Sequence, residues 1–202
     1  MARGLSDFVY LTVSTGIGAA VFARGAPLAG ADGLAGELGH TPATEAGIRC
    51  GCGARGHLEA LAGGDAMARI AEARLRRGYS GPLADYRRRT GRPLTAADLT
   101  QAADAGDLLA RSILDRGRRA IAAAVIGFVN AFNPQAVIIG GSVAQAGGAA
   151  FIHLIRTAVD KGSFPTAARR VSIGLSALGV CVSNAILGKR SPPVCHICPN
   201  GG

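Results

Sequence analysis

The sequence predicts an α/β protein that opens with a strand, a turn and a returning strand. An apolar, β-branched run at 8–13 precedes a turn at 14–18 with two glycines, and a second apolar run at 19–23 follows it. Farther along, a long amphipathic helix precedes a short buried strand at 135–139. Because strands and helices alternate after the opening hairpin, the pattern is typical of the α/β class. The 202 residues, 49% of them hydrophobic, suffice for one domain or one lobe of a bilobal protein.

The first half of the chain is rich in turns. A third short strand is expected near residues 27–30, and 31–39 is expected to be a loop or the start of a short helix. Residues 41–55 form a glycine-rich loop. A helix is expected to open at 56–61 and to resume at 64–77 after a break.

The second half alternates helices with strands. Thr95 is expected to cap a helix, because its hydroxyl can accept a hydrogen bond from an N–H group of the first turn. Asn133 and Pro134 are expected to stop the long helix, since proline cannot continue it. In order, the expected elements are a polar connection at 78–93, a helix starting at 95–98, a long helix at 104–132, a strand at 135–139, a helix at 149–159 and a strand at 170–175.

Residues 180–202 lose this periodicity and have the composition of a disordered tail. Cys195 and Cys198, with His196 between them, look like a metal or redox pair. Nothing supplies a second pair, so we do not expect a site there. A frameshift or a wrongly assigned end of the reading frame is our hypothesis for this tail.

Four potential metal ligands lie close together in the glycine-rich segment: His40, Cys50, Cys52 and His57. Two thiols and two imidazoles form a set that structural zinc prefers, and four protein ligands leave no open position for a metal-bound water. A lone histidine would more often be structural, but this one is followed by a Cys-x-Cys pair. We therefore predict a structural Zn²⁺ that holds the loop.

Two carboxylates flank the same segment, Glu37 and Glu59. The four nitrogen and sulfur ligands already satisfy a metal, so the carboxylates are free to accept hydrogen bonds from a polar ligand such as a sugar. The competing interpretation of Glu59 is a solvated residue in the first turn of a helix, stabilised by the helix dipole.

Two glycine turns follow predicted strands, at 12–18 and at 138–142. Backbone N–H groups and hydroxyls in such turns can hold phosphate oxygens. Each also has a plain structural interpretation, the first as an ordinary hairpin and the second as an ordinary strand-to-helix turn. The residues alone leave both interpretations open.

The net charge of +9 does not by itself indicate nucleic-acid binding. The arginines are spread over predicted helix faces at 69–92 and 111–119, without interleaved aromatic residues, so we expect no nucleic-acid partner. No apolar run reaches the roughly 18 residues of a membrane span, and no secretory signal is visible. Five cysteines, with two in a metal-type pair, fit a reducing cytoplasm.

The segments Glu37-Leu38-Gly39-His40 and Cys50-Gly51-Cys52-Gly53-Ala54-Arg55-Gly56-His57-Leu58-Glu59 resemble the signature of the ROK family of repressors and sugar kinases. The family usually has a third cysteine where this chain has His57. Imidazole is also a zinc ligand, so the departure changes the ligand set from Cys3His to Cys2His2.

The resemblance covers residues 3 to about 179 and implies a ribonuclease H-like, actin-like ATPase fold. Residues 1–179 would then be the C-terminal lobe of a bilobal sugar kinase. Within it, 31–62 would be the sugar-binding and zinc loop, 12–18 and 138–142 would be the nucleotide-side segments, and 180–202 would be an aberrant tail.

By this resemblance the parent activity is that of a glucokinase, with transfer of the γ-phosphate of ATP, with Mg²⁺, to O6 of glucose or a related hexose. Homodimerisation through this lobe is also implied. The implied sugar-binding residues are Glu37, His40 and Glu59, and the implied nucleotide-binding residues are Thr15, Gly16, Gly18, Gly140 and Gly141.

Two family features are missing. The sequence has neither Asp-x-Gly-Gly-Thr nor the Asn-Asp motif whose Asp is the general base, so we expect no catalytic residue here and place that Asp upstream of Met1. Half a cleft should not transfer phosphate efficiently, and the opening strands are expected to lose partners and expose apolar surface. The alternatives are a sugar-sensing repressor fragment and a catalytically dead, zinc-stapled sugar-binding lobe.

Overall fold

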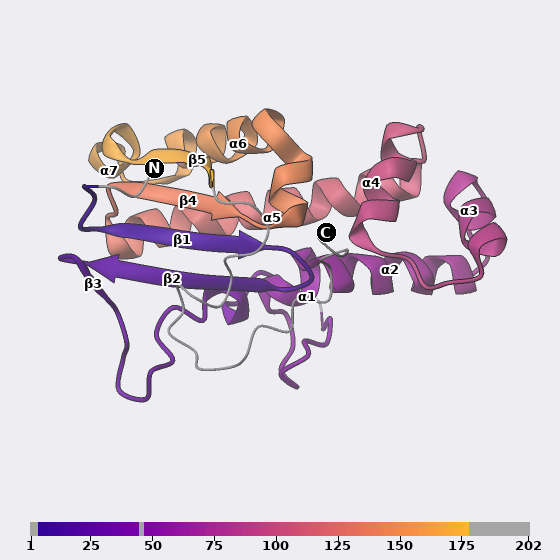
Figure 1. The fold of residues 1–202 in the computed structure, drawn as a ribbon, viewed down its shortest axis with the longest axis horizontal. Coiled ribbons are helices and arrows are strands. Elements are labelled where there is room, and N and C mark those ends of the chain that lie inside the picture. Colours follow the sequence, from indigo (N-terminus) through magenta and orange to yellow (C-terminus); the bar gives the residue numbers. More distant parts are fainter. Residues whose placement is uncertain (1–3, 45–46, 178–202) are drawn as a thin grey trace, which may run out of the picture.

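The computed structural model describes residues 4–44 and 47–177, which form a mixed five-stranded sheet with helices (Figure 1). The strand order is β3-β2-β1-β4-β5. Strands β1 and β2 are antiparallel, whereas β1 pairs with β4, and β4 with β5, in parallel. The strands are β1 (Phe8–Val13), β2 (Ile17–Ala23), β3 (Ala26–Pro27), β4 (Ala136–Gly140) and β5 (Ser172–Leu175). The predicted α/β class is therefore confirmed.

The opening strands do not lose their partners, which corrects one expectation. Strand β1 lies at the centre of the sheet, with Val13 opposite Ile17 of β2 and Phe8 opposite Ala136 of β4. Strand β2 in turn lies between β1 and β3. The sequence misled because β1 and β4 are far apart along the chain, and nothing local announces their pairing.

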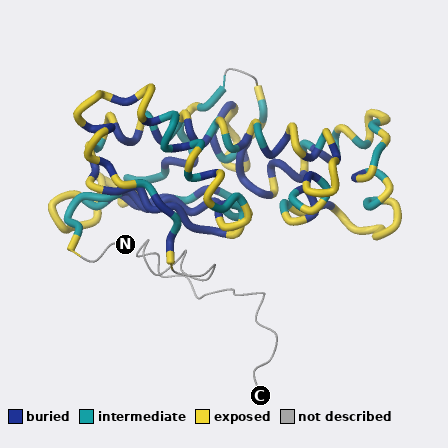
Figure 2. Tube along the Cα trace, turned by 90° about the horizontal axis from the view of Figure 1, so that it is seen from above, coloured by how far each residue is buried: buried dark blue, intermediate teal, exposed yellow. Residues whose placement is uncertain are grey.

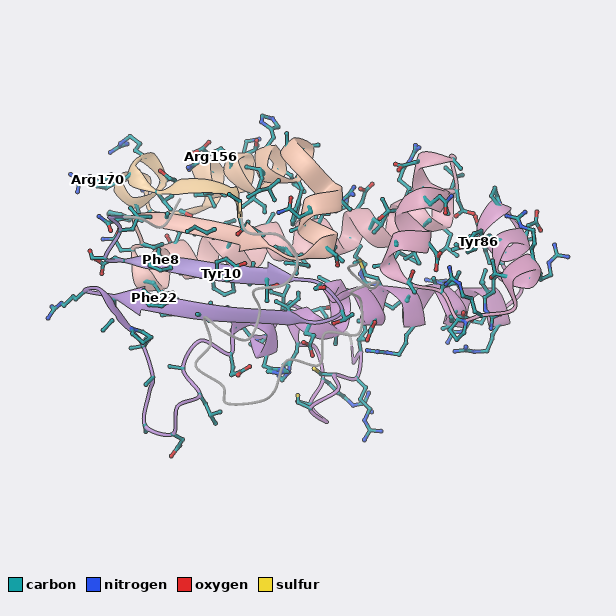
Figure 3. The ribbon with its side chains drawn as sticks, viewed as in Figure 1. Phe8, Tyr10, Phe22, Tyr86, Arg156 and Arg170 are labelled. Atoms are coloured by element: carbon teal, nitrogen blue, oxygen red, sulfur yellow. The ribbon has the colours of Figure 1, made fainter. Side chains whose placement is uncertain are left out.

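The main core lies between the sheet and the helices that pack on it (Figure 2). Val9, Leu11 and Val13 share one face of β1, as the two-residue period of a strand requires, and belong to one core with residues of the long helix α5 (Leu108–Phe132) and of helix α6 (Ser142–Gly162). On the opposite side of β1 and β2, Phe8 and Phe22 stack with ring centroids 4.4 Å apart (Figure 3).

A second core holds the helical end of the molecule together, at the right of Figure 1. Met67, Leu83, Leu99 and Leu114 meet there from four different helices. The helical elements of the chain are η1 (Leu38–His40), α1 (Leu58–Ala62), α2 (Gly64–Arg76), α3 (Pro82–Thr90), α4 (Ala96–Asp104), α5 (Leu108–Phe132), α6 (Ser142–Gly162) and α7 (Pro165–Arg170).

Helix α3 was expected to be a polar connection, which is wrong. Proline at its first position and Gly91 just past its end, with a left-handed φ of 66°, delimit a nine-residue helix that buries only Leu83. Proline suits the first position because an N–H group there has no partner within the helix. Glycine suits the position after the helix because it tolerates positive φ. A single buried residue leaves no apolar periodicity to find.

The expected helix at 104–132 is α5, which begins at Leu108, four residues later than expected. Gly106, with φ 92°, breaks the run, and the Asp107 carboxylate then caps α5 by accepting from the Ala110 N–H at 2.9 Å. Thr95 caps α4 as predicted, and Asn133 ends α5 with φ 44°. Helix α6 begins seven residues earlier than expected and is interrupted at Gly148, and α7 was not predicted.

Within the part of the chain that the structure describes, no helix is both long and apolar enough to cross a membrane. The predictions for the tail at 180–202, including Cys195 and Cys198, lie outside the described residues.

Candidate functional site

The four predicted metal ligands converge in the structure. His40 ends the short helix η1, and His57 immediately precedes α1. Isolated β-bridges, Pro42 with His57 and Arg49 with Arg55, close the intervening loop on itself. The loop tip is tightened further by the N–H of Cys50, which donates to the carbonyl of Ala54 at 2.8 Å. The ligand atoms of His40, Cys50, Cys52 and His57 all lie within 4.8 Å of one another.

The distances in this group fit a tetrahedral ion. The two Nδ1 atoms of His40 and His57 are 3.3 Å apart, His40 Nδ1 is 3.6 Å from Cys50 Sγ, and His57 Nδ1 is 3.4 Å from Cys52 Sγ. Zinc bonds of about 2.0–2.1 Å to nitrogen and about 2.3 Å to sulfur would give tetrahedral edges of roughly 3.3 Å between nitrogens and roughly 3.6 Å between nitrogen and sulfur. The four side chains therefore fit zinc.

Cys50 is the buried thiol of the group, and Cys52 is the exposed one. Burial raises the pKa of the Cys50 thiol, because the charged thiolate is disfavoured away from water. A metal ion offsets this cost, since it binds the thiolate form.

His40 presents its two ring nitrogens to different neighbours. Nδ1 faces the ligand group, whereas Nε2 lies 4.0 Å from a carboxylate oxygen of Glu37. A metal held by Nδ1 would leave the proton on Nε2, which fixes the tautomer. His40 would then offer a hydrogen-bond donor beside the Glu37 acceptor, and both side chains are about one-third exposed.

Glu59 joins the metal loop to the first glycine turn. Its Oε2 accepts from the Ile17 N–H at 2.9 Å, and its Oε1 lies 3.8 Å from Cys50 Sγ. A Cβ on residue 16 would collide with Glu59 Oε2, so glycine at this position allows the carboxylate to reach the turn. Glu59 is therefore more than a solvated residue of the first helical turn.

The first glycine turn rests on the start of α2. The carbonyls of Ser14 and Thr15 accept from the N–H groups of Gly64 and Asp65 at 2.8 and 2.9 Å. A cavity of about 150 Å³, which we call the turn pocket, lies beside this contact. Its lining is Thr15, Gly16, Gly51, Glu59, Ala60, Asp65, Ala66 and Arg69.

The second glycine turn adjoins a larger cavity. Ser14 Oγ and Ser142 Oγ are 3.0 Å apart, so the two glycine turns meet. A cavity of about 330 Å³, which we call the helix pocket, opens between α4 and α6 beside Ser142. Its lining is Ala96, Ala97, Thr100, Gln101, Asp104, Ser142, Val143 and Ala146. The α4 residues were missed from the sequence, since no motif marks a cavity between two distant helices.

Three of the implied nucleotide residues do not line either pocket. Gly18 lies within β2 opposite Thr12. A Cβ at 140 would collide with the Tyr10 hydroxyl, and one at 141 would collide with the backbone of Val13. Close packing against the backbone therefore requires glycine at 141, and packing against the Tyr10 side chain favours it at 140, whereas Thr15 and Gly16 line the turn pocket.

A family model described as the ROK family matches residues 1–174. The chain belongs to the ROK family. It is 41% identical over 161 residues to the glucokinase of Thermotoga maritima, covering 78% of this chain and 50% of that protein. It is 33% identical over 173 residues to the DNA-binding transcriptional repressor Mlc of Escherichia coli, covering 85% of this chain and 41% of the repressor.

Among solved structures, the ROK hexokinase of Thermus thermophilus superposes with a TM-score of 0.73 at 31% identity, over 89% of this chain and 54% of that one. The predicted family and the actin-like ATPase fold class are thus confirmed. The chain spans about half the length of the curated relatives it matches.

Proposed function

We propose that this chain is the sugar- and nucleotide-binding lobe of a glucokinase-like ROK kinase. The proposed reaction transfers the γ-phosphate of ATP, with Mg²⁺, to O6 of glucose or a related hexose. One observation carries the proposal: Glu59 lies between the His40 group and the glycine turn at Thr15 and Gly16. Acceptors for sugar hydroxyls and a phosphate-binding turn are therefore neighbours, as phosphoryl transfer to a sugar requires.

Sugar binding is assigned to Glu37, His40 and Glu59. The two carboxylates accept from neighbouring hydroxyls, and these charge-assisted hydrogen bonds orient the ring. His40 donates from Nε2 while its Nδ1 belongs to the metal-ligand group. Bound at His40, Cys50, Cys52 and His57, zinc would act structurally, clamping the loop and fixing this tautomer.

Nucleotide binding is assigned to the two glycine turns. Thr15 and Gly16 present a hydroxyl and backbone to phosphate oxygens in the turn pocket. The helix pocket has the volume and mixed lining of a small-molecule site and suits the base and ribose. Gly18, Gly140 and Gly141 shape the strands and turns around these contacts rather than line the pockets.

The general base is assigned to a residue outside this chain. The attacking hydroxyl must lose its proton as it meets the γ-phosphate, and in ROK kinases an Asp of the Asn-Asp motif does this. We place that Asp upstream of Met1, so the lobe comprises 1–179 and contains no catalytic residue. Homodimerisation and a cytoplasmic location belong to the same proposal.

The alternative is a sugar-sensing repressor lobe, and the similarity to the repressor Mlc supports it. Both classes would share the sugar and zinc residues, as would a catalytically dead binding lobe. Upstream sequence separates them: a winged-helix segment indicates a repressor, and Asp-x-Gly-Gly-Thr with Asn-Asp indicates a kinase.

Glucose binding and glucose-dependent ADP formation test the proposal on the zinc-loaded 202-residue chain. We expect calorimetric glucose binding that Glu37→Gln weakens at least about tenfold, because one charge-assisted hydrogen bond is lost. We expect little ADP formation. A folded, zinc-loaded chain that binds no glucose would contradict the sugar site, and rapid turnover would contradict the external base.

A further inference from the structure

The turn pocket contains one cationic side chain with no partner among the described residues. Arg69 lines the pocket, and its guanidinium makes no hydrogen bond or ion pair to any residue that the structure describes. Other arginines nearby are paired: Arg87 with Glu72 at 2.8 Å and Arg92 with Asp98 at 2.7 Å. Arg69 is exposed, as is Arg74 farther along α2, but Arg69 alone of the two lines the cavity, so it combines an unpaired charge with a place in the pocket lining.

Asp65 sharpens the contrast, because it lies one helical turn before Arg69 on α2. Residues four apart on a helix are neighbours, and Asp before Arg is the favourable order for an ion pair. Both line the pocket, yet no ion pair joins them. The guanidinium is therefore available to a ligand in the cavity.

The size and lining of the pocket limit what it can hold. At about 150 Å³ it is smaller than the 300–1,000 Å³ typical of whole-ligand sites, so it takes only one group of a larger ligand. Guanidinium matches phosphate through paired N–H donors, and the Thr15 hydroxyl and Gly16 backbone lie in the same lining. The group that fits this combination is a phosphoryl group.

We propose that Arg69 binds a phosphoryl group in the turn pocket. This rests on the proposed function and extends it, because it assigns the charge that would offset the phosphoryl oxygens. The group could be the terminal phosphate of a nucleoside triphosphate or the phosphate of a phosphorylated hexose. Asp65 and Glu59 also line the pocket, and their carboxylates repel an anion. Binding is therefore expected to require Mg²⁺, which offsets this repulsion.

Calorimetric titration of the full 202-residue chain with AMP, ADP and a non-hydrolysable ATP analogue, each with Mg²⁺, tests the assignment. The wild-type chain is expected to bind the triphosphate more tightly than AMP. Arg69→Met should lower triphosphate affinity by about 10- to 100-fold, the value of a hydrogen bond to a charged group, and leave AMP affinity unchanged. Arg69→Lys should recover part of the loss.

Arg74→Met is the matched control, since Arg74 is an exposed arginine of the same helix that does not line the pocket. It removes the same charge and should leave every affinity unchanged. If Arg69→Met and Arg74→Met reduce triphosphate binding equally, the effect is long-range charge and the assignment is overturned. An Arg69→Met chain with wild-type affinity for both the triphosphate and glucose 6-phosphate overturns it as well.

The second arm separates the two phosphate sources. If Arg69→Met weakens glucose 6-phosphate but not glucose or the triphosphate, the pocket takes the sugar phosphate, and the assignment of Arg69 stands. If the folded wild-type chain binds glucose and AMP, but binds neither the triphosphate nor glucose 6-phosphate more tightly than these, the proposed function stands and the role of Arg69 fails. If it binds none of these ligands, both fail.

Discussion

Two polar clusters of similar size differ in whether they contain charged groups of opposite sign that pair with one another. In the loop that ends at His57, four ligand atoms converge, yet two thiols and two imidazoles supply no opposite charge for one another. At the other end of the molecule, the buried Asp98 carboxylate accepts from Arg92 Nη1 and Nη2 at 2.7 and 2.8 Å, from Tyr86 Oη at 2.7 Å and from the Thr95 N–H at 2.8 Å.

The difference separates a ligand site from a structural one. Buried polar atoms are almost always hydrogen-bonded, so a cluster that is complete without a ligand needs none. The Asp98 cluster links α3, which carries Tyr86 (Figure 3), to α4, and both carboxylate oxygens of Asp98 already accept hydrogen bonds. The His40 cluster gathers four potential metal ligands and no Lys or Arg, and a bound zinc ion would supply the opposite charge.

Removal of the metal should have the largest effect. Wild-type protein in free zinc at about a thousand times its Kd is the reference state. Relative to it, Cys50→Ser, or removal of the metal with a strong chelator, is expected to lower the free energy of unfolding by about 4 kcal/mol. Thermal unfolding together with elemental analysis measures this. Asp98→Asn should keep a full equivalent of zinc, and a wild-type chain that chelation neither strips nor destabilises would contradict a structural metal.

Loss of the Asp98 charge should rank second. Asp98→Asn leaves the Arg92 guanidinium without its partner, and we expect a loss of about 3 kcal/mol in urea unfolding, at the low end for buried pairs because Arg92 is about half exposed. The exposed pair of Asp115 with Arg118 is the control, and Asp115→Asn should cost below about 1 kcal/mol. Equal losses would show that Asp98 is not a special fastening point.

The pH dependence should be a smaller form of the same effect. Hydrogen bonds from Arg92 hold the pKa of Asp98 well below its ordinary value. A lowered folded-state pKa means that this contribution to stability is complete above the unfolded value of about 3.9 and is lost as the pH falls below it. Urea midpoints measured between neutral and acidic pH should fall more steeply for the wild type than for Asp98→Asn. Parallel curves would refute this.

Restoration of the usual family ligand should change stability least. His57→Cys gives a third thiolate, which is a stronger ligand for zinc than neutral imidazole, and we expect zinc affinity to rise by about tenfold at neutral pH. Competition with a coloured chelator measures the change. The mutant would fail the expectation if its zinc were released more readily than that of the wild type.

The convergence of four candidate metal ligands and the family could be predicted, because both depend on the chemistry of one short segment. His40 and His57 are separated by one loop, and the spacing already implies convergence. The helix pocket could not be predicted, since Gln101 and Val143 meet only after α4 and α6 pack. Helix α3 was missed because its polar surface buries one leucine, although Pro82 and Gly91 could have marked its ends.

The role of Arg69 was also invisible in the sequence. It is one of many arginines along α2 and α3, and composition cannot distinguish a solvated guanidinium from one that lines a cavity. The pocket beside it exists because the glycine turn at Thr15 contacts the start of α2, where the Gly64 and Asp65 N–H groups donate to the carbonyls of Ser14 and Thr15.

The central position of β1 also affects how the chain is made. Phe8 pairs with Ala136, so β1 is synthesised well before its parallel neighbour β4 exists. At about 5–20 residues per second the delay is on the order of ten seconds. During it the hairpin of β1 and β2 must keep an apolar edge apart from other nascent chains, and a chaperone that shields that edge would govern the yield of folded protein.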